Sequence, residues 1–241
     1  MNREQTPKRA ATVILLRRAQ PKGFEVFLTR RPESMPFLGG MYCYPGGSVA
    51  EEDFSARMID RCFGLTPVQA RKIIGAQFSP QAAMGLWVAA VRELFEEVGV
   101  LLAVEESGFP LVLDPARAGA LAQRQAALLN RSCSFLSLLE SEKLRCDLGS
   151  LAYFSHWQTP AQAATCFDTR FFLAALPGDQ TPFFTSNEVA HSLWLTPDRA
   201  LKLFDRGELP MIFSTFTALR TLADYETLES VLKEFWPGRQ L

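Results

Sequence analysis

Residues 79–100 carry the clearest periodic pattern of hydrophobic and polar positions in the chain. On a helix of about 100° per residue, their large apolar side chains share one side: Val88, Val91, Leu94, Phe95 and Val98. Three acids share the other side: Glu93, Glu96 and Glu97. Ser79 is a suitable N-cap with Pro80 at the first helical position, and Gly99 suits the left-handed turn that ends a helix. The pattern predicts an amphipathic helix with an acidic face.

Shorter periodic segments on both sides of this helix predict further strands and helices. Strands are predicted at 11–18, 24–31, 41–44, 151–157, 168–175 and 191–195, and residues 100–104 are either a strand or the exit from the helix. Helices are predicted at 53–61, 66–75, 114–130, 134–145 and 198–205, with two more within 209–236. The segment 20–23, with its proline and glycine, is a turn signal that joins the first two strands in a hairpin.

Composition narrows the class of protein. The 241 residues, 48% of them hydrophobic and 19 of them Phe, are enough for one large domain with insertions. A net charge of −1 without a polybasic run gives no general attraction to nucleic acid or to an anionic membrane. No run of 18 apolar residues occurs, and the polar start has no apolar leader. We therefore expect neither nucleic acid nor membrane as a partner, and a cytoplasmic location.

The metal-binding residue types exclude two common frameworks. The five cysteines are scattered without a C-x-x-C pair, and the chain has only two histidines, His156 and His191. This argues against a structural zinc site and against a disulfide framework. His156 and His191 are read as packed or surface residues. Asp168 and Arg170, which share a strand face, either form a structural pair or contact a nucleotide, and the structural pair is favoured.

The acidic face of the central helix is badly placed for stability. Glu93 and Glu97 are like charges four residues apart, which costs a few tenths of a kcal/mol. The acids also lie in the last two turns, where the helix dipole disfavours negative charge. Arg92, four residues before Glu96, gives only the weaker orientation of an ion pair. A solvated acidic face is the simple reading; the alternative is a divalent cation held by carboxylate oxygens.

A second motif upstream favours the cation. Tyr44-Pro45 precede Gly46-Gly47, and paired glycines let a backbone approach a phosphate or a metal closely. Asp53 follows, and after a spacer comes Arg92-Glu93-Leu94-Phe95-Glu96-Glu97-Val98-Gly99. This order of residues resembles the Nudix box of Nudix hydrolases. Two differences stand out: an Asp where the family has a Glu, and a spacer of 38 residues, 54–91, which indicates an insertion over 54–85. Long surface insertions add little closure entropy.

The resemblance implies the fold and the domain plan. The expected fold is α/β: a Nudix-type α/β/α sandwich with a mixed sheet and extra helices. One domain spans 1–241, with insertions at 54–85 and 114–145 and a C-terminal helical cap at 209–241. The helices of 114–145 are read as a packing or dimer-forming element, so a homodimer is one expectation. The interrupted box resembles the branch that includes a peroxisomal coenzyme A diphosphatase.

The resemblance also implies the roles of the site residues. Glu93, Glu96 and Glu97, together with the Gly46 carbonyl, would hold Mg²⁺ or Mn²⁺, and Asp53 stands where the family has a further acid. Arg92 would orient the glutamates. Oxygen ligands favour such hard cations over zinc. The general base stays open among Glu96, Glu97 and, from outside the box, Glu188.

Substrate contacts are expected at the mouth of the glycine loop. Arg30 and Arg31 either grip a phosphate of the substrate or only solubilise a strand end, while Gly46 and Gly47 admit the substrate to the backbone. The expected activity is metal-dependent hydrolysis of a nucleoside diphosphate linked to another group, with coenzyme A or acyl-CoA first. The alternatives are an ADP-ribose, nucleotide-sugar or dinucleotide pyrophosphatase, and a non-catalytic nucleotide sensor. The three glutamates argue against the sensor.

Overall fold

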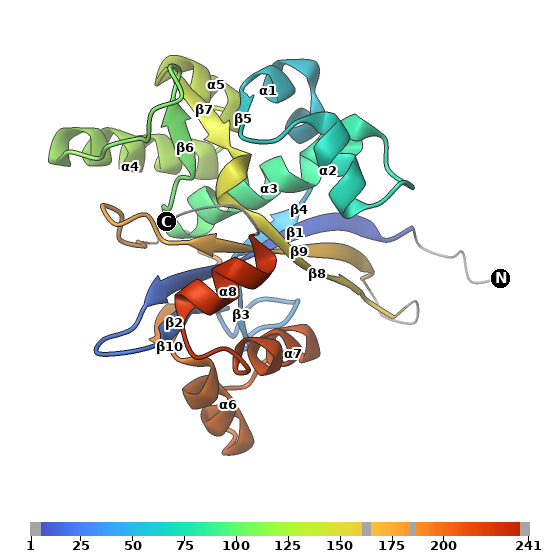
Figure 1. The fold of residues 1–241 in the computed structure, drawn as a ribbon, viewed down its shortest axis with the longest axis vertical. Helices are drawn as coiled ribbons and strands as arrows, with labels where there is room; N and C mark the ends of the chain where they lie inside the picture. Colours follow the sequence, from blue (N-terminus) through green and yellow to red (C-terminus); the bar gives the residue numbers. More distant parts are fainter. Residues whose placement is uncertain (1–5, 161–164, 184–186, 237–241) are drawn as a thin grey trace.

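The computed structural model describes residues 6–160, 165–183 and 187–236. Within these residues the chain forms a seven-stranded mixed sheet with helices on both faces (Figure 1). Its strands are β1 (Lys8–Arg18), β2 (Phe24–Arg30), β3 (Tyr42–Cys43), β4 (Gly46–Ser48), β8 (Ala152–Gln158), β9 (Phe167–Ala175) and β10 (His191–Leu195). The α/β class expected from the sequence is confirmed.

The order of the strands explains why the sheet is mixed. The main path runs β10-β2-β1-β9-β8, with β3 paired to β2 and β4 paired to β1. β1 and β2 form the predicted antiparallel hairpin, whereas β1 and β9 pair in parallel over nine residues. Parallel neighbours need a long crossover, and here the crossover contains the central helix and both predicted insertions. The long spacer in the sequence is thus accommodated outside the sheet.

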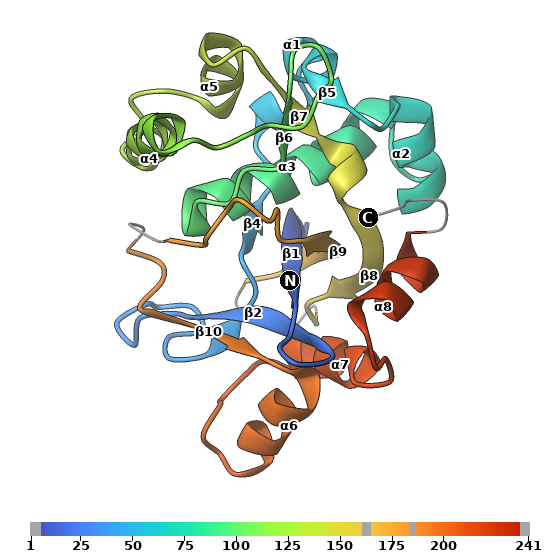
Figure 2. The same ribbon diagram turned by 60° about the vertical axis from the view of Figure 1, so that its left-hand side comes forward.

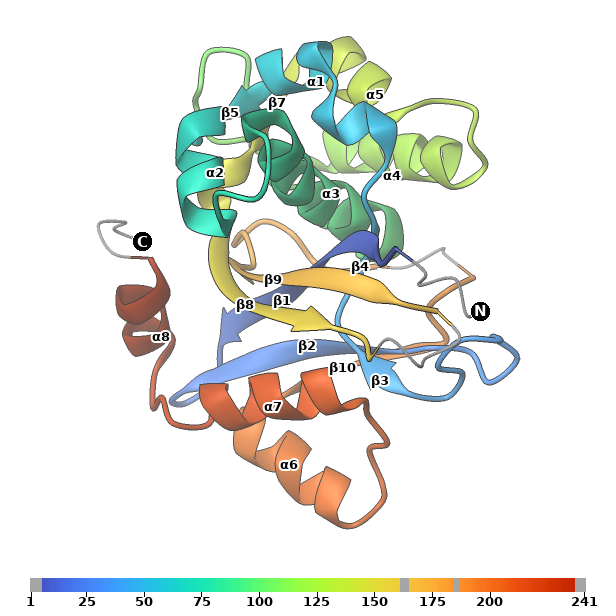
Figure 3. The same ribbon diagram turned by 90° about the vertical axis from the view of Figure 1, so that its right-hand side faces the viewer.

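The central helix α3 (Pro80–Val98) covers one face of the sheet (Figure 3). Its ends are those predicted: the Ser79 side chain accepts a hydrogen bond from the Ala82 amide, and Gly99 has φ 70°. The apolar side of α3 packs on inward-facing residues of the strands, among them Val13, Leu15 and Phe172. This packing fixes where the acidic side of the helix lies relative to the glycine loop.

The opposite face of the sheet is covered by the C-terminal helices (Figure 3). These are α6 (Pro197–Asp205), α7 (Phe213–Leu222) and α8 (Leu228–Phe235). They pack on the alternate side chains of the same strands, including Ile14, Leu16 and Leu28. Residues 209–236 therefore cap the sheet, while 237–241 of the predicted cap lie outside the described residues.

The two insertions meet in one layer above α3, which the sequence did not predict (Figures 1 and 2). The first contains α1 (Ala56–Asp60), β5 (Cys62–Phe63) and α2 (Pro67–Ile74); the second contains α4 (Pro115–Leu129), α5 (Phe135–Ser141) and β7 (Leu144–Asp147). β5 and β7 join β6 (Ala103–Glu105) in a small sheet of order β5-β7-β6. β5 of the first segment pairs with Cys146 and Asp147, the part of β7 that directly follows residues 114–145, so the two segments, read as independent additions, are joined through β7.

One helix was predicted to be longer than the helix that the structure shows. Residues 134–145 were expected to be helical throughout, but α5 ends at Ser141 and the chain turns at Lys143, where φ is 55°. Leu144 and Arg145 then belong to β7, which pairs with β6. Pairing with a distant strand overrides the helical pattern here. In the described residues we find no helix with the length and apolar character needed to cross a membrane.

The residues Asp168 and Arg170 form the predicted structural pair. Arg170 Nη1 donates to Asp168 Oδ1, and Nε2 of His156 lies 2.5 Å from the same oxygen. Arg170 is only 2% exposed, and its guanidinium lies over the Phe78 ring, 5.3 Å from the centroid. Burial acts to raise the pKa of Asp168, but the Arg170 guanidinium outweighs it and lowers that pKa overall.

Asp168→Asn is expected to lower the free energy of unfolding at pH 7 by about 1–3 kcal/mol, because a buried guanidinium loses its counter-charge. A carboxyl whose folded pKa is depressed stabilises above its unfolded pKa, about 3.9, and loses that contribution as pH falls through the folded value. Urea unfolding between pH 7 and pH 3 should show that the difference in free energy of unfolding between wild type and Asp168→Asn becomes smaller as the pH falls. Asp205→Asn, on an exposed aspartate, is the control. A difference in free energy of unfolding that stays constant over this pH range would contradict a lowered pKa of Asp168.

Candidate active site

The glycine loop reaches the sheet as β4, which pairs antiparallel with β1. A Cβ atom at Gly46 would lie 2.6 Å from the Thr12 Cα atom, and one at Gly47 would lie 2.5 Å from Oε1 of Glu93. The backbone contact at Gly46 leaves no room for a side chain, so this position requires glycine, whereas a side chain at position 47 would displace the Glu93 carboxylate from its place. The paired glycines thereby bring a backbone segment directly against a carboxylate of α3.

Arg92 is the centre of the polar network at this point. Its Nε and Nη2 donate to the two carboxylate oxygens of Asp53, each at 2.9 Å, and Nη2 also donates to the Ser48 carbonyl at 2.9 Å. Nη1 donates to Glu93 at 2.8 Å and to Glu96 at 3.3 Å. A guanidinium has five N–H donors, and here five acceptor atoms surround it.

Asp53 binds the Nε and Nη2 edge of the Arg92 guanidinium, away from the Nη1 group that faces Glu93 and Glu96. It is 1% exposed, and its Oδ2 accepts a further hydrogen bond from the Ala50 amide at 2.7 Å. Both of its oxygens thus already accept charge-assisted or backbone hydrogen bonds. In this arrangement Asp53 anchors Arg92, and the role of metal ligand given to it by the sequence stays a prediction.

The three glutamates of α3 are crowded and partly desolvated. Burial is the main reason that the pKa of Glu93 rises to about 7, with Arg92 opposing the rise and Glu96 adding to it. Burial likewise raises the pKa of Glu96. It raises the pKa of Glu97 well above the usual range, where the charges of Glu93 and Glu188 act in the same direction.

Two groups oppose the rise in the pKa of Glu97: the charge of Arg31 and a hydrogen bond from the Gly46 backbone. Burial is therefore the main reason that the pKa values of these carboxyls are raised, and repulsion between the carboxyls adds to it. A divalent cation is the group that would relieve this repulsion, and carboxylate oxygens are the donors that Mg²⁺ and Mn²⁺ prefer. In its donor chemistry the site fits such an ion.

A preformed cage for the ion is not present among the described residues, where no three His, Cys, Asp or Glu side chains are grouped so that they hold a metal. In this arrangement Arg92 Nη1 engages one oxygen each of Glu93 and Glu96. The glutamates are crowded in this arrangement, and their convergence on one metal ion or two stays a prediction.

The two arginines expected at the mouth of the loop are separated by the alternation of strand side chains. Arg31 lies on the α3 side, where its Nη2 is 3.5 Å from Glu188 Oε2 and its charge acts on Glu97. Arg30 donates instead to the Gly40 carbonyl and to Glu33, and its guanidinium lies near the Tyr42 ring. The structure brings Arg31 to the acids and leaves Arg30 on the other side of β2.

Glu188 reaches the acids from a different part of the chain. It follows β9 and precedes β10, and its side chain is 54% exposed, more than that of any α3 glutamate. Its charge raises the pKa of both Glu96 and Glu97, with burial the larger cause in each case. Glu188 thus lies at the solvent side of the cluster.

Cys43 is a half-buried neighbour that the sequence did not single out. Burial, followed by the charge of Glu97, raises the pKa of its thiol to about 11. The thiol is near the Thr29 hydroxyl, at 3.8 Å. Cys43 is therefore a neutral side chain that packs beneath the acids.

A hollow of about 430 Å³ opens beside the acids, and its far wall comes from the second insertion. The lining residues are Ala50, Glu52, Arg92, Glu96, Leu128, Leu129, Arg131, Cys133, Ser134, Phe135 and Glu188. Residues 114–145 were interpreted as a packing or dimer-forming element, with no part in the site. The structure places the corner between α4 and α5 directly at the site.

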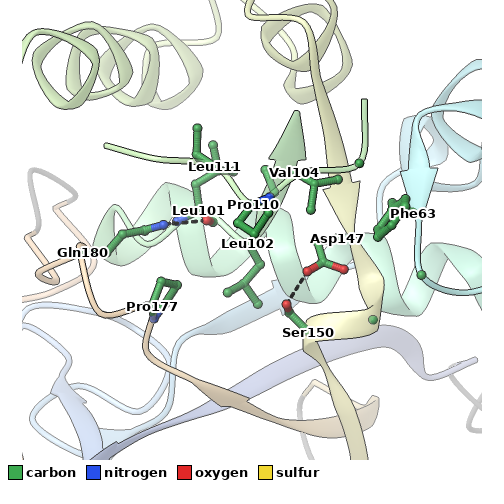
Figure 4. A pocket seen from close by; sticks show the side chains of 14 residues that line it. Phe63, Leu101, Leu102, Val104, Pro110, Leu111, Asp147, Ser150, Pro177 and Gln180 are labelled. Atoms are coloured by element: carbon green, nitrogen blue, oxygen red, sulfur yellow. Dashed lines mark hydrogen bonds between the residues drawn. The ribbon is translucent and has the colours of Figure 1, made fainter. Parts of the chain in front are cut away.

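A second hollow, of about 380 Å³, lies beside the small sheet (Figure 4). Leu101, Leu102, Val104, Pro110 and Leu111 form much of its wall. Its polar groups are paired: the Gln180 amide exchanges two hydrogen bonds with the Leu101 backbone, and the Ser150 hydroxyl donates to Asp147. With a single carboxylate and a mostly apolar wall, it lacks the charged groups that pyrophosphate chemistry requires.

The mixed sheet, the glycine loop and the acid-bearing helix together define a Nudix-type α/β/α sandwich. Comparison with known sequences makes the assignment specific. The sequence profile of the NUDT19 Nudix domain matches residues 7–222, and the chain therefore belongs to this family.

Curated relatives and a solved structure agree with this assignment. The chain is 27% identical to the acyl-coenzyme A diphosphatase NUDT19 of Gallus gallus and 28% identical to that of Homo sapiens, over 88% and 91% of its length. It spans only about two thirds of those relatives, 65% and 66%. The crystal structure of a NUDIX hydrolase from Alicyclobacillus acidocaldarius is 28% identical, with a TM-score of 0.75 over 95% of this chain and 96% of that one.

Arg92→Leu is expected to lower the free energy of unfolding by about 3–5 kcal/mol, because it leaves the buried Asp53 carboxylate without a cation. The double variant Arg92→Leu/Asp53→Asn should lose less than the single variant, since it removes the orphaned charge and keeps an acceptor for the Ala50 amide. Urea unfolding of wild type, both single variants and the double variant measures the coupling. Arg57→Leu, in the exposed pair with Glu140, is the matched control and should cost less than about 1 kcal/mol. If the loss in free energy of unfolding of the double variant equals the sum of the two single losses, Arg92 and Asp53 are not coupled.

Proposed function

We propose that this chain is a metal-dependent hydrolase that cleaves the pyrophosphate bond of a nucleoside diphosphate linked to another group. Coenzyme A or acyl-CoA is the leading substrate, giving 3′,5′-ADP and the corresponding phosphopantetheine. The observation that carries the proposal is the crowded, desolvated set of Glu93, Glu96 and Glu97 against the glycine loop. Burying and crowding carboxyls costs a fold free energy, whereas a divalent cation held by their oxygens would offset both the desolvation and the repulsion.

Each side chain has a defined part in this proposal. Glu93, Glu96 and Glu97, with the Gly46 carbonyl, hold Mg²⁺ or Mn²⁺. A bound ion of this kind neutralises phosphate charge and lowers the pKa of a bound water. Arg92 keeps the glutamates in place from behind, and Asp53 is assigned to fixing Arg92 because both of its oxygens face that guanidinium.

Arg31 is the better candidate for the phosphate grip, because it lies with the acids while Arg30 pairs with Glu33. The general base remains among Glu96, Glu97 and Glu188. Exposure favours Glu188, whose side chain is 54% exposed and can meet water at the solvent side of the cluster. Gly46 and Gly47 complete the substrate site because they keep its backbone edge free of side chains.

The choice of substrate rests on the relatives. Two of them carry the name acyl-coenzyme A diphosphatase, and the match covers about nine tenths of this chain. ADP-ribose, nucleotide sugars and dinucleotides are the second choice. A nucleotide sensor that does not cleave is third, since it would not require all three carboxylates.

A cytoplasmic location is part of the same proposal. All five cysteines are free thiols. This includes Cys62 and Cys146, which lie opposite each other on neighbouring strands without forming a disulfide. Free thiols are typical of reducing compartments. The homodimer stays a prediction.

Glu97→Gln is expected to abolish turnover, a loss of at least about a hundredfold, and to weaken uptake of Mg²⁺ and Mn²⁺. The assay incubates the protein with either ion and with CoA, acetyl-CoA, ADP-ribose or a dinucleotide, and identifies the products by mass. 3′,5′-ADP indicates the CoA activity, AMP the second choice, and binding without product the sensor.

Calorimetry on the same samples measures ion uptake with and without nucleotide. Glu208→Gln, which changes an exposed glutamate, serves as the control and should behave as wild type. A fully active Glu97→Gln protein, or a wild type that takes up no ion, refutes the metal assignment.

A further inference from the structure

The corner between α4 and α5 carries an inference about the substrate. It comprises residues 128–135, and six of them line the hollow beside Arg92, Glu96 and Glu188. The corner therefore faces the place where the diphosphate is cleaved in the proposed function, across a space of about 430 Å³. A group on the substrate that extends from the diphosphate would meet this wall.

The corner is fixed to the site from two sides. Gln125 of α4 is fully buried, and its amide donates to the carbonyl oxygens of Phe95 at 2.9 Å and of Glu96 at 3.1 Å. On the other side, Glu52, in the 3-10 turn Glu51–Phe54 after the glycine loop, accepts from the amide of Leu136, the residue that follows the corner, at 3.3 Å. These bonds tie the corner to the segment of α3 that bears the acids, so its position is set by the site itself.

Arg131 lies in this corner and has no evident role in stabilising the fold. It adopts the left-handed conformation, with φ 59°, which costs a side chain other than glycine about 1 kcal/mol or more. Its backbone amide donates to the Leu128 carbonyl, but among the described residues its guanidinium forms no ion pair or side-chain hydrogen bond. An exposed arginine is thus held in a strained turn at the edge of the hollow.

The charges of the hollow define what Arg131 can bind. Arg92 is the other cation in the lining, and its five donors are engaged by Asp53, Glu93, Glu96 and the Ser48 carbonyl. The acids Glu52, Glu96 and Glu188 also line the hollow and would repel a phosphate. Arg131 is therefore the lining group able to attract an anion from the substrate.

We infer that Arg131 binds a phosphate monoester of the substrate other than the diphosphate that is cleaved. This inference rests on the proposed function and deepens it: the substrate class is a nucleoside diphosphate derivative with one additional phosphate. A guanidinium binds such a group by paired, charge-assisted hydrogen bonds. In CoA the corresponding group is the 3′-phosphate.

The decisive comparison pairs two substrates with two proteins. Wild type should prefer CoA over 3′-dephospho-CoA by about tenfold or more in kcat/KM, the value expected for a hydrogen bond between charged groups. Arg131→Gln should lose that preference by reducing kcat/KM for CoA while leaving 3′-dephospho-CoA unchanged. Arg131→Lys should restore part of the preference, because it returns the charge.

Two further variants control for structural effects. Arg131→Gly removes the side chain and relieves the positive φ, so it should fold at least as stably as wild type and still lose the preference. Arg206→Gln, at an exposed arginine after α6, should keep the preference. An equal loss on both substrates would show that Arg131 only supports the fold and would overturn the inference.

A binding measurement separates this inference from the proposed activity. Calorimetry should show 3′,5′-ADP binding wild type about tenfold more tightly than 5′-AMP, with the difference lost in Arg131→Gln. If wild type hydrolyses neither form of CoA but shows this difference, the proposed activity fails and the phosphate site stands. If both forms are hydrolysed equally and the two nucleotides bind equally, the activity stands and the inference fails.

Discussion

The structure depends most on one ion pair, between Arg92 and the buried Asp53. It joins the glycine loop to the central helix across a gap of 38 residues in the sequence. Through Nη1, Arg92 also donates hydrogen bonds to Glu93 and Glu96, so it holds these two carboxylates in place. Because the guanidinium has all five donors engaged, a movement of the loop would be transmitted to the acids. The contact between Asp53 and Arg92 therefore holds the two parts of the site together, although 38 residues separate them in the sequence.

The same arrangement explains how repelling acids are tolerated. Glycines at positions 46 and 47 admit the backbone so closely that the Glu93 carboxylate is enclosed, and burial of this kind disfavours its charged form. Arg92 compensates on one side and Arg31 on the other, but neither is enough to return these carboxyls to their ordinary pKa. Stability is given up at this point, as is common where a binding site must be kept ready for a ligand.

Local signals in the sequence predicted the local features well. The limits of α3 follow from Ser79, Pro80 and Gly99, whose effects act within one turn of the helix, and the first hairpin follows from its turn. Features that depend on distant segments were missed. β5 is too short to give a pattern, and β7 resembled the end of a helix. Gln125 did leave a trace, because it interrupts the apolar face shared by Leu121 and Leu128, and a polar residue there requires a partner.

The small sheet β5-β7-β6 has a consequence for the history of this chain. β5 lies in the first predicted insertion, and β7 begins in the second, at Leu144, and continues just beyond it to Asp147; Cys62 of β5 lies opposite Cys146 of β7. A descendant that lost the first insertion would leave an edge of β7 without its hydrogen-bonding neighbour and would uncover apolar surface that is now enclosed. The two segments are therefore expected to be inherited together, with paired gain or loss among relatives instead of independent variation in their lengths.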